Sequence, residues 1–147
     1  MKHTIITVSV FFLVVLSGCD KCKEKTMSAK QFENEFGCVD TKHDLTVDLT
    51  DECIIIRSDE EFNSKVTGTC HPDIDFALYD LVIGKQSTAN EVDTILYEYG
   101  TVCPDDELTL AVDIVQSLIT TPDNVVYHAL VPKLGDEQGV FINVTVR

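Results

Sequence analysis

Six cysteines and four histidines are the side chains of this 147-residue chain best suited to chemistry. Cysteines can bind zinc, act as nucleophiles or form disulfides, and their spacing helps to separate these uses. Cys70 and His71 are adjacent rather than spaced apart, and no second cysteine–histidine pair follows at the spacing of a zinc site. The sequence therefore predicts no metal site. We interpret His43, His71 and His128 as surface or capping residues.

Residues 1–19 carry the pattern of an exported protein. Lys2 gives a positively charged start, and an apolar run follows from Ile5 to Leu16. This run is too short to anchor a helix across a bilayer, but it has the length of the apolar core of a secretory signal peptide. Directly after it, Leu16-Ser17-Gly18-Cys19 resembles the lipobox of bacterial lipoproteins. The resemblance implies that residues 1–18 are a signal peptide and that Cys19 becomes acylated.

Acylation of Cys19 would make the lipid bilayer of the bacterial cell envelope the first partner of the chain. Several acyl chains, each contributing about 0.8 kcal/mol per buried methylene, hold a protein persistently at a membrane. Residues 19–27 would then form a lipidated tether, and residues 28–147 leave room for a single domain.

Export also decides how the remaining cysteines are interpreted, because disulfides are their default use in an oxidising compartment. With Cys19 acylated an odd number remains, and Cys22 in the charged tether is the expected unpaired residue. The disulfide candidates are Cys38, Cys53, Cys70 and Cys103. They allow three connectivities, of which we favour Cys38–Cys53 with Cys70–Cys103.

The chain is strongly acidic, with a formal net charge of −14. Nucleic acids and anionic head groups would repel such a domain, so neither is expected as a partner. The charge suits solubility or a basic protein partner.

Alternating apolar residues predict a domain made mainly of β-strands. Strands are expected at 45–49, 53–56, 79–86, 91–102, 107–118, 125–131 and 139–147. No helical crossover separates the later strands, so an antiparallel meander is the simplest arrangement. We therefore expect a mainly β fold, with α+β as the alternative, in which an antiparallel sheet forms a small sandwich or an open barrel.

Two short helices are expected near the N-terminal side of this domain. Ser28 opens a capping box, and Gly37 is placed to end the helix that follows. Ser58 opens a second capping box, and its helix would direct Phe62 and Val66 into the core.

The sequence lacks the motifs of common enzyme mechanisms. It contains neither Gly-x-Ser-x-Gly nor Ser-x-x-Lys. Asp73, Asp75 and residues 105–107 offer oxygens for calcium, but they do not continue into the EF-hand pattern, and we interpret them as turn acids. We expect no enzyme, no cofactor and no metal.

Ile74-Asp75-Phe76 followed by Leu81–Gln86 resembles a segment of small uncharacterised lipoproteins of the Bacteroidota type. More loosely, the order of elements over 53–147 is similar to the PrcB-type subunit of bacterial lipoprotein protease complexes. These resemblances imply an envelope protein with a protein partner, at the outer rather than the inner membrane. From the residues alone, Ile74 and Phe76 are expected in the core, and Asp75 in a turn where its carboxylate accepts backbone hydrogen bonds.

The leading hypothesis is a non-enzymatic envelope lipoprotein that binds or supports a protein partner through strand edges and loops. The alternatives are a small envelope enzyme and a carbohydrate- or metal-binding module. A concave pocket with ionisable groups of shifted pKa would favour an enzyme. An exposed apolar patch or an unpaired strand edge would favour the partner-binding subunit.

Overall fold

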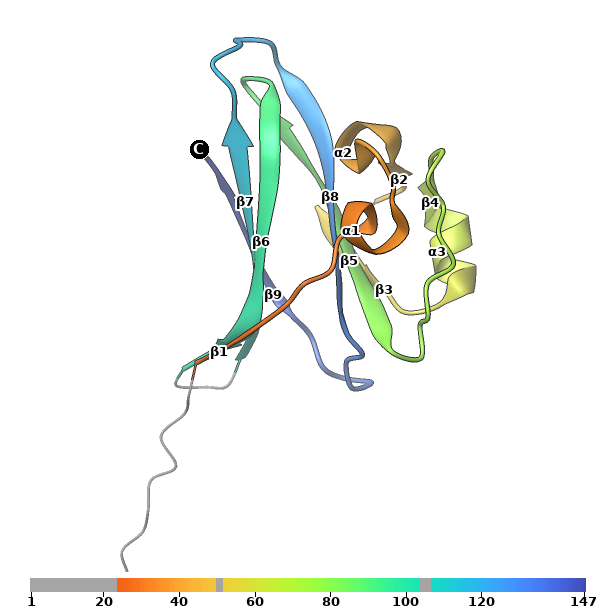
Figure 1. Ribbon diagram of the computed structural model, residues 1–147. Coiled ribbons are helices and arrows are strands. Elements are labelled where there is room, and N and C mark those ends of the chain that lie inside the picture. The colour runs from red at the N-terminus through yellow and green to blue at the C-terminus, as the bar shows by residue number, and fades with distance from the viewer. Residues whose placement is uncertain (1–23, 50–51, 104–106) are drawn as a thin grey trace, which may run out of the picture.

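A computed structural model describes residues 24–49, 52–103 and 107–147, and these residues form three stacked layers (Figure 1). The outer sheet has the strand order β1 (Lys25–Met27), β6 (Val92–Val102), β7 (Glu107–Gln116) and β9 (Phe141–Val146). The middle sheet has the order β3 (Cys53–Ile56), β5 (Tyr79–Thr88) and β8 (Asp123–Pro132). The third, helical layer holds α1 (Phe32–Phe36), α2 (Thr41–Asp44), α3 (Asp59–Lys65) and the short antiparallel pair β2 (Thr46–Val47) and β4 (Val66–Thr67).

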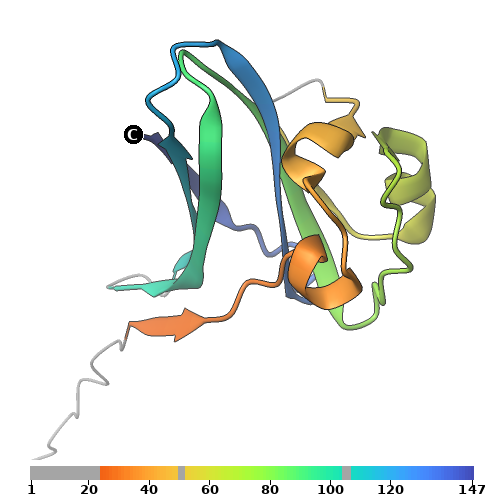
Figure 2. The same cartoon turned by 45° about the horizontal axis from the view of Figure 1, so that its top comes forward.

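This arrangement confirms the mainly β, sandwich-like fold. The antiparallel meander expected for the later strands was wrong. β5 pairs with β8 in the middle sheet, whereas β6 and β7 pair in the outer sheet. In addition, β9 pairs with β7 in parallel, from Thr109 opposite Phe141 to Ile114 opposite Val146. After β7 the chain crosses to the middle sheet as β8 and returns to the outer sheet as β9. Figure 2 shows the two sheets facing each other, with β8 (blue) beside the helical layer.

The apolar content of β8 explains why it lies in the middle layer. Residues 125–131 are all buried, as expected for a strand covered on both faces. Val125, Tyr127, Ala129 and Val131 pack in the core shared with the outer sheet. Val126 and Leu130 alternate with them and pack in a second core shared with the helical layer. A strand with apolar residues on both faces is stable only between two layers.

The helices agree in part with their predicted caps. Ser58 caps α3 by accepting a hydrogen bond from the Glu61 amide, and Phe62 is buried as expected. Gly37 ends α1 in the left-handed conformation, at φ 71°. The Ser28 cap was wrong, because α1 begins later and its N-cap is Gln31 without a side-chain bond. The short helix α2 was not predicted.

Glycine at position 84 permits the close packing of β5 against its neighbours. A Cβ atom there would overlap the hydroxyl of Tyr127, which lies opposite residue 84 on β8. It would also lie 2.8 Å from the carbonyl oxygen of Glu52. The glycine of the Gly84-Lys85-Gln86 segment thus makes room for Tyr127.

Candidate functional site

A small polar pocket lies at the seam between the two sheets, where β6 and β8 approach each other. Its volume is about 200 Å³. Thr94, Ile95 and Tyr97 line it from β6, and Val126 and His128 line it from β8. The helical layer closes it from the other side with Gln31, Glu33, Asp40, Thr41 and Lys42.

The innermost residue of this pocket is His128, whose side chain is 2% exposed. Its imidazole stacks on the ring of Phe32, with 4.4 Å between the ring centroids. Its backbone amide donates a hydrogen bond of 3.0 Å to the hydroxyl of Tyr97. The imidazole therefore joins β8 to α1, and the backbone of the same residue joins β8 to β6.

The Nε2 atom of His128 lies 2.6 Å from Oγ1 of Thr41. The same hydroxyl contacts the carboxylate of Glu33, which also accepts a bond of 3.2 Å from the Thr41 amide. An ionised carboxylate only accepts, so the Thr41 hydroxyl donates its proton to Glu33 and accepts from His128 Nε2. This fixes the imidazole as the tautomer with its proton on Nε2. Its unprotonated Nδ1 is buried and has no hydrogen-bond partner among the described residues.

Burial makes His128 hard to protonate. Desolvation lowers the pKa of His128 to about 4, and the nearby Glu33 carboxylate opposes this effect only in part. The imidazole is therefore neutral at pH 7. Placing a positive charge in this apolar environment would cost more than the carboxylate returns.

The direction of these hydrogen bonds decides what the cluster can do chemically. A nucleophilic threonine needs its hydroxyl proton pointed at a base that can take it. Here the Thr41 proton points at the carboxylate, while His128 acts as a donor at Nε2. The remaining basic nitrogen, Nδ1, is sealed from solvent. The cluster thus holds α1, α2 and β8 together, and its partly exposed base is the Glu33 carboxylate rather than the imidazole.

Lys42 lies where the pocket meets the start of β6. Its ammonium donates hydrogen bonds of 2.9 Å to the carbonyl oxygens of both Val92 and Asp93. These carbonyls belong to the start of β6, beyond the short segment Tyr99–Thr101 that β1 pairs with. Lys42 therefore satisfies strand-edge groups that would otherwise be open.

The sequence contained a signal for His128 that the prediction did not use. His128 was interpreted as a surface or capping residue, and the structure shows that this was wrong. A histidine inside the continuous apolar run of residues 125–131 must share the burial of its neighbours.

His43 does lie at the surface, between the carboxylates of Asp40 and Asp123, and His71 packs on the ring of Phe62.

The cysteines pair differently from the prediction. Cys38 bonds to Cys70, with 5.8 Å between their Cα atoms, which overturns both favoured pairs. Cys53 has a free thiol and is half-buried on β3, and Cys103 is disulfide-bonded. The lipidation residue Cys19 and the expected unpaired Cys22 lie outside the described residues. The pairing was missed because the helical layer, which brings Cys38 to Cys70, is assembled from segments distant in sequence.

The Ile74-Asp75-Phe76 segment behaves as predicted from its residues. Ile74 and Phe76 are buried in the core under the helical layer. The carboxylate of Asp75 accepts a hydrogen bond of 3.0 Å from the Ala77 amide and fixes the turn into β5. Asp105 and Asp106 lie outside the described residues.

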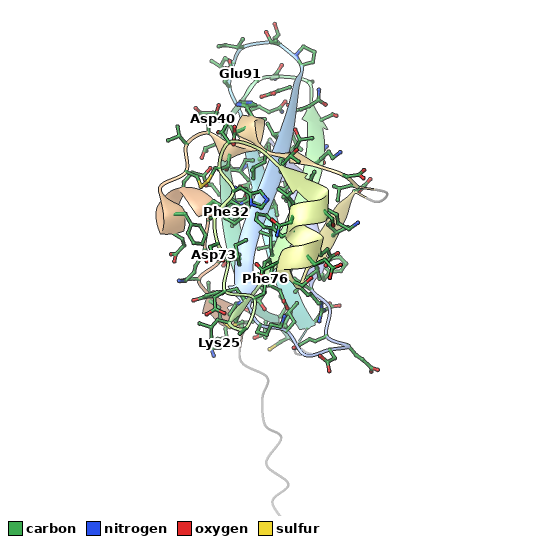
Figure 3. All side chains as sticks on the ribbon, turned by 90° about the vertical axis from the view of Figure 1, so that its right-hand side faces the viewer. Lys25, Phe32, Asp40, Asp73, Phe76 and Glu91 are labelled. Carbon is green, nitrogen blue, oxygen red and sulfur yellow. A yellow bond between two sulfur atoms is a disulfide. The ribbon has the colours of Figure 1, made fainter. Side chains whose placement is uncertain are left out.

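One loop stands out at the end of the domain opposite β1. Leu118, in the connection from β7 to β8, is 100% exposed, and Ile119 is 56% exposed. Glu91 holds this loop on both sides, because its carbonyl accepts from the Ser117 amide at 2.7 Å and its amide donates to the Ile119 carbonyl at 3.1 Å. Figure 3 shows Glu91 and Lys25 at opposite ends of the domain.

Among residues 24–49, 52–103 and 107–147, no group of three or more His, Cys, Asp and Glu side chains is placed to hold a metal ion. In the same part of the chain, no helix has the length and apolar character needed to cross a membrane.

No protein-family model matches the chain, and no curated protein and no solved structure is significantly similar to it.

Proposed function

We propose that this chain is an envelope lipoprotein anchored through acylated Cys19, and that it serves as a non-enzymatic subunit that docks a protein partner. The observation that carries the proposal is the Leu118–Ile119 loop. Two adjacent apolar side chains are exposed there on a backbone that Glu91 holds by two hydrogen bonds. Exposed apolar side chains on an ordered loop are typical of protein contacts, since they lose little entropy on binding.

The position of the loop agrees with a tether at the other end. The described chain enters the domain through β1, at the bottom of Figure 1, while the β7–β8 connection lies at the top. A domain held near a membrane through its β1 end would present Leu118 and Ile119 outward. Strands of 10 residues separate the two ends by roughly 33 Å.

The seam pocket supports an enzyme less well than the exposed loop supports a docking subunit. Its volume of about 200 Å³ is below the range of roughly 300–1,000 Å³ typical of ligand sites. The Nδ1 nitrogen of His128 is buried, and the Thr41 hydroxyl is committed to the Glu33 carboxylate. We therefore attribute the lowered pKa of His128 to its burial in the core rather than to a catalytic role.

The test is site-specific photocrosslinking of the full-length, lipidated chain in bacterial envelopes. A photoreactive residue at position 118 should give one stoichiometric adduct. The same residue at position 78 is the matched control, because Leu78 is also apolar and exposed but lies in the turn before β5. A separate Leu118→Asp variant should lose co-purification with that partner, and Leu78→Asp should keep it. Equal adducts from both positions, or a partner retained by Leu118→Asp, would contradict docking at this loop.

Anchoring is tested independently by metabolic labelling with a fatty acid. The full-length chain should carry the label and remain with the membrane fraction, whereas Cys19→Ser should lose the label. An unlabelled wild-type chain would overturn the lipoprotein assignment.

A further inference from the structure

The free edge of β9 is a strand edge that the fold leaves unprotected. β9 is the last strand of the outer sheet, and among the described residues only β7 pairs with it. Its six residues include no charged side chain and no proline, and its register with β7 has no bulge. Proteins usually protect a free edge with charges, proline or a bulge, because its unpaired backbone groups attract another strand. By contrast, β3 at the edge of the middle sheet has four residues and lies between Glu52 and Arg57.

The hydrogen bonds of Arg147 show which backbone groups of β9 point away from β7. The Arg147 amide donates to the Ile114 carbonyl at 3.0 Å, and the Arg147 carbonyl accepts from the Gln116 amide at 2.8 Å. Both groups of Arg147 thus face β7, and this direction alternates from residue to residue along a strand. The outward-facing amides and carbonyls therefore belong to Ile142, Val144 and Val146.

We propose that this edge pairs antiparallel with the β9 edge of a second copy of the chain, about a two-fold axis at Val144. Ile142 then lies opposite Val146 of the second copy, and Val144 lies opposite its own counterpart. Residues that face each other in this way exchange two backbone hydrogen bonds, so three pairs with two bonds each use every outward-facing group. A shift of two residues in either direction leaves two such pairs within β9.

The side chains match in the same register. Ile142, Val144 and Val146 lie on the face of β9 that is directed to the core between the sheets, so the pairs on this face are apolar on both sides. On the outer face, Asn143 lies opposite Thr145 of the second copy. Phe141, which is 58% exposed, lies opposite the Arg147 guanidinium, an arrangement that suits a cation–π contact.

Charge favours a second copy over an unrelated strand. Two chains of net charge −14 repel each other unless the surfaces that meet are uncharged or complementary, and the facing pairs contain no carboxylate. The antiparallel arrangement also brings Arg147 of one copy towards the exposed Asp136 and Glu137 of the other, because these acids lie in the loop that leads into β9. Arg147 bonds to Asp113 of its own copy, and a guanidinium has donors for a second acceptor.

The geometry also sets the strength and the orientation of the dimer. Six residues a side make a small interface beside the roughly 20–30 of a standard complex, so pairing is expected to be weak and concentration-dependent. The two-fold axis is perpendicular to the sheet, which places the β1 ends of the two copies at opposite ends of the dimer. Two copies anchored in one membrane would therefore pair with their sheets lying along it, and the Leu118–Ile119 loops would face sideways.

Disulfide trapping of full-length chains in bacterial envelopes tests the register. Cells make two differently tagged chains, one with Asn143→Cys and the other with Thr145→Cys. In the proposed pairing these exposed positions have Cα atoms about 4.5 Å apart, within the range of a disulfide. Mild oxidation should link the two tags about tenfold more than in the control pair Glu98→Cys with Thr145→Cys, because Glu98 is exposed on β6 and away from the edge. Equal linking in both pairs would overturn the pairing.

A charge exchange at the same positions provides a test without crosslinking. Wild-type chains with two tags should co-purify from detergent extracts. Asn143→Asp with Thr145→Asp places like charges directly opposite each other and should reduce this co-purification about fivefold. The corresponding double lysine variant should also co-purify poorly with itself, whereas mixing the aspartate and lysine chains should restore the pair. Restoration requires both variants to be folded, so its failure would count against the dimer.

The outcomes separate this inference from the proposed function. Neither readout depends on acylation of Cys19 or on a partner at Leu118, so the dimer can be found where those proposals fail. An adduct from position 143 to a different protein, in place of the second copy, would show that β9 pairs with a partner strand and would overturn the dimer.

Discussion

His128 and Thr41 are 87 residues apart in sequence, yet Nε2 of the first lies 2.6 Å from Oγ1 of the second inside the protein. The contact ties β8 of the middle sheet to α2 of the helical layer. Because Glu33 accepts from the same hydroxyl, three elements meet at one side chain. The seam between the sheets is thus held by polar bonds inside an apolar core, where such bonds are costly to break.

The buried imidazole should make stability depend on pH. The unfolded chain binds a proton at His128 near pH 6.5, whereas the folded chain does so only near pH 4. Above pH 6.5 both states are neutral and this group has no effect. Between pH 6.5 and 4 only the unfolded state is protonated, so the free energy of unfolding falls, by about 3 kcal/mol at most. Urea unfolding at pH 7, 5.5 and 4.5 measures the fall, and His128→Gln should remove most of it. If the unfolding free energy of His128→Gln fell with pH as steeply as that of wild type, His128 would not be the group responsible.

His43 should show the opposite sign. Hydrogen bonding to Asp123 raises the pKa of His43, which is partly exposed. Its contribution is therefore complete below pH 6.5 and is lost as the pH rises through the folded-state pKa. NMR titration should place the His43 transition above the usual value in wild type and return it towards that value in Asp123→Asn. A normal His43 titration in wild type would contradict the contact.

Removing the Thr41 hydroxyl should destabilise the fold. Thr41→Val keeps the shape of the side chain but leaves the His128 Nε2 proton and the Glu33 carboxylate without their shared partner. A buried donor left unsatisfied costs about 1–3 kcal/mol. Thr145→Val is the matched control, because Thr145 is exposed on β9, and it should change the unfolding free energy by less than about 0.5 kcal/mol. Equal effects of the two substitutions would argue against the hydrogen-bond chain.

Glycine 84 should not tolerate even a methyl group. Gly84→Ala would place a Cβ against the Tyr127 hydroxyl and the Glu52 carbonyl, and overpacking of this kind costs about 1–3 kcal/mol. Tyr127→Phe in the same chain should recover part of the loss, because it removes one of the overlapping atoms. Gly139→Ala is the control, since among the described residues no atom beyond its two chain neighbours lies within 4 Å of a Cβ at that position. Thermal unfolding compares the variants, and a fully stable Gly84→Ala protein would contradict this packing.

The Cys38–Cys70 disulfide should contribute substantially to stability. It closes a loop with a sequence separation of 32, and crosslinks of this size contribute about 2–4 kcal/mol, largely by restricting the unfolded chain. Replacing both cysteines by serine should lower the denaturant midpoint without changing the far-UV circular dichroism spectrum. Cys53→Ser serves as the control for loss of a cysteine outside a disulfide, and a double variant as stable as that control would disprove the effect.

Local patterns predicted most of the secondary structure. Residues 53–56 form β3 as expected, and 107–118 contains β7, which ends at Gln116. The Ser58 cap and the Gly37 stop were also correct, because each depends on contacts within one turn of the chain. The prediction of 45–49 as a full strand was too long, since β2 spans only Thr46–Val47. Its pairing with β4 depends on a partner distant in sequence.

The sequence by itself determined the strands, the apolar positions and the resemblance of residues 16–19 to a lipobox, because these depend on neighbouring side chains. The tertiary structure alone decided which cysteines pair, that β9 runs parallel to β7, and that His128 is buried against Thr41. Each of these depends on segments far apart in sequence packing into the same layer. The hydrophobic burial that drives this packing is non-directional, so the periodicity of a strand does not specify which segment will cover it.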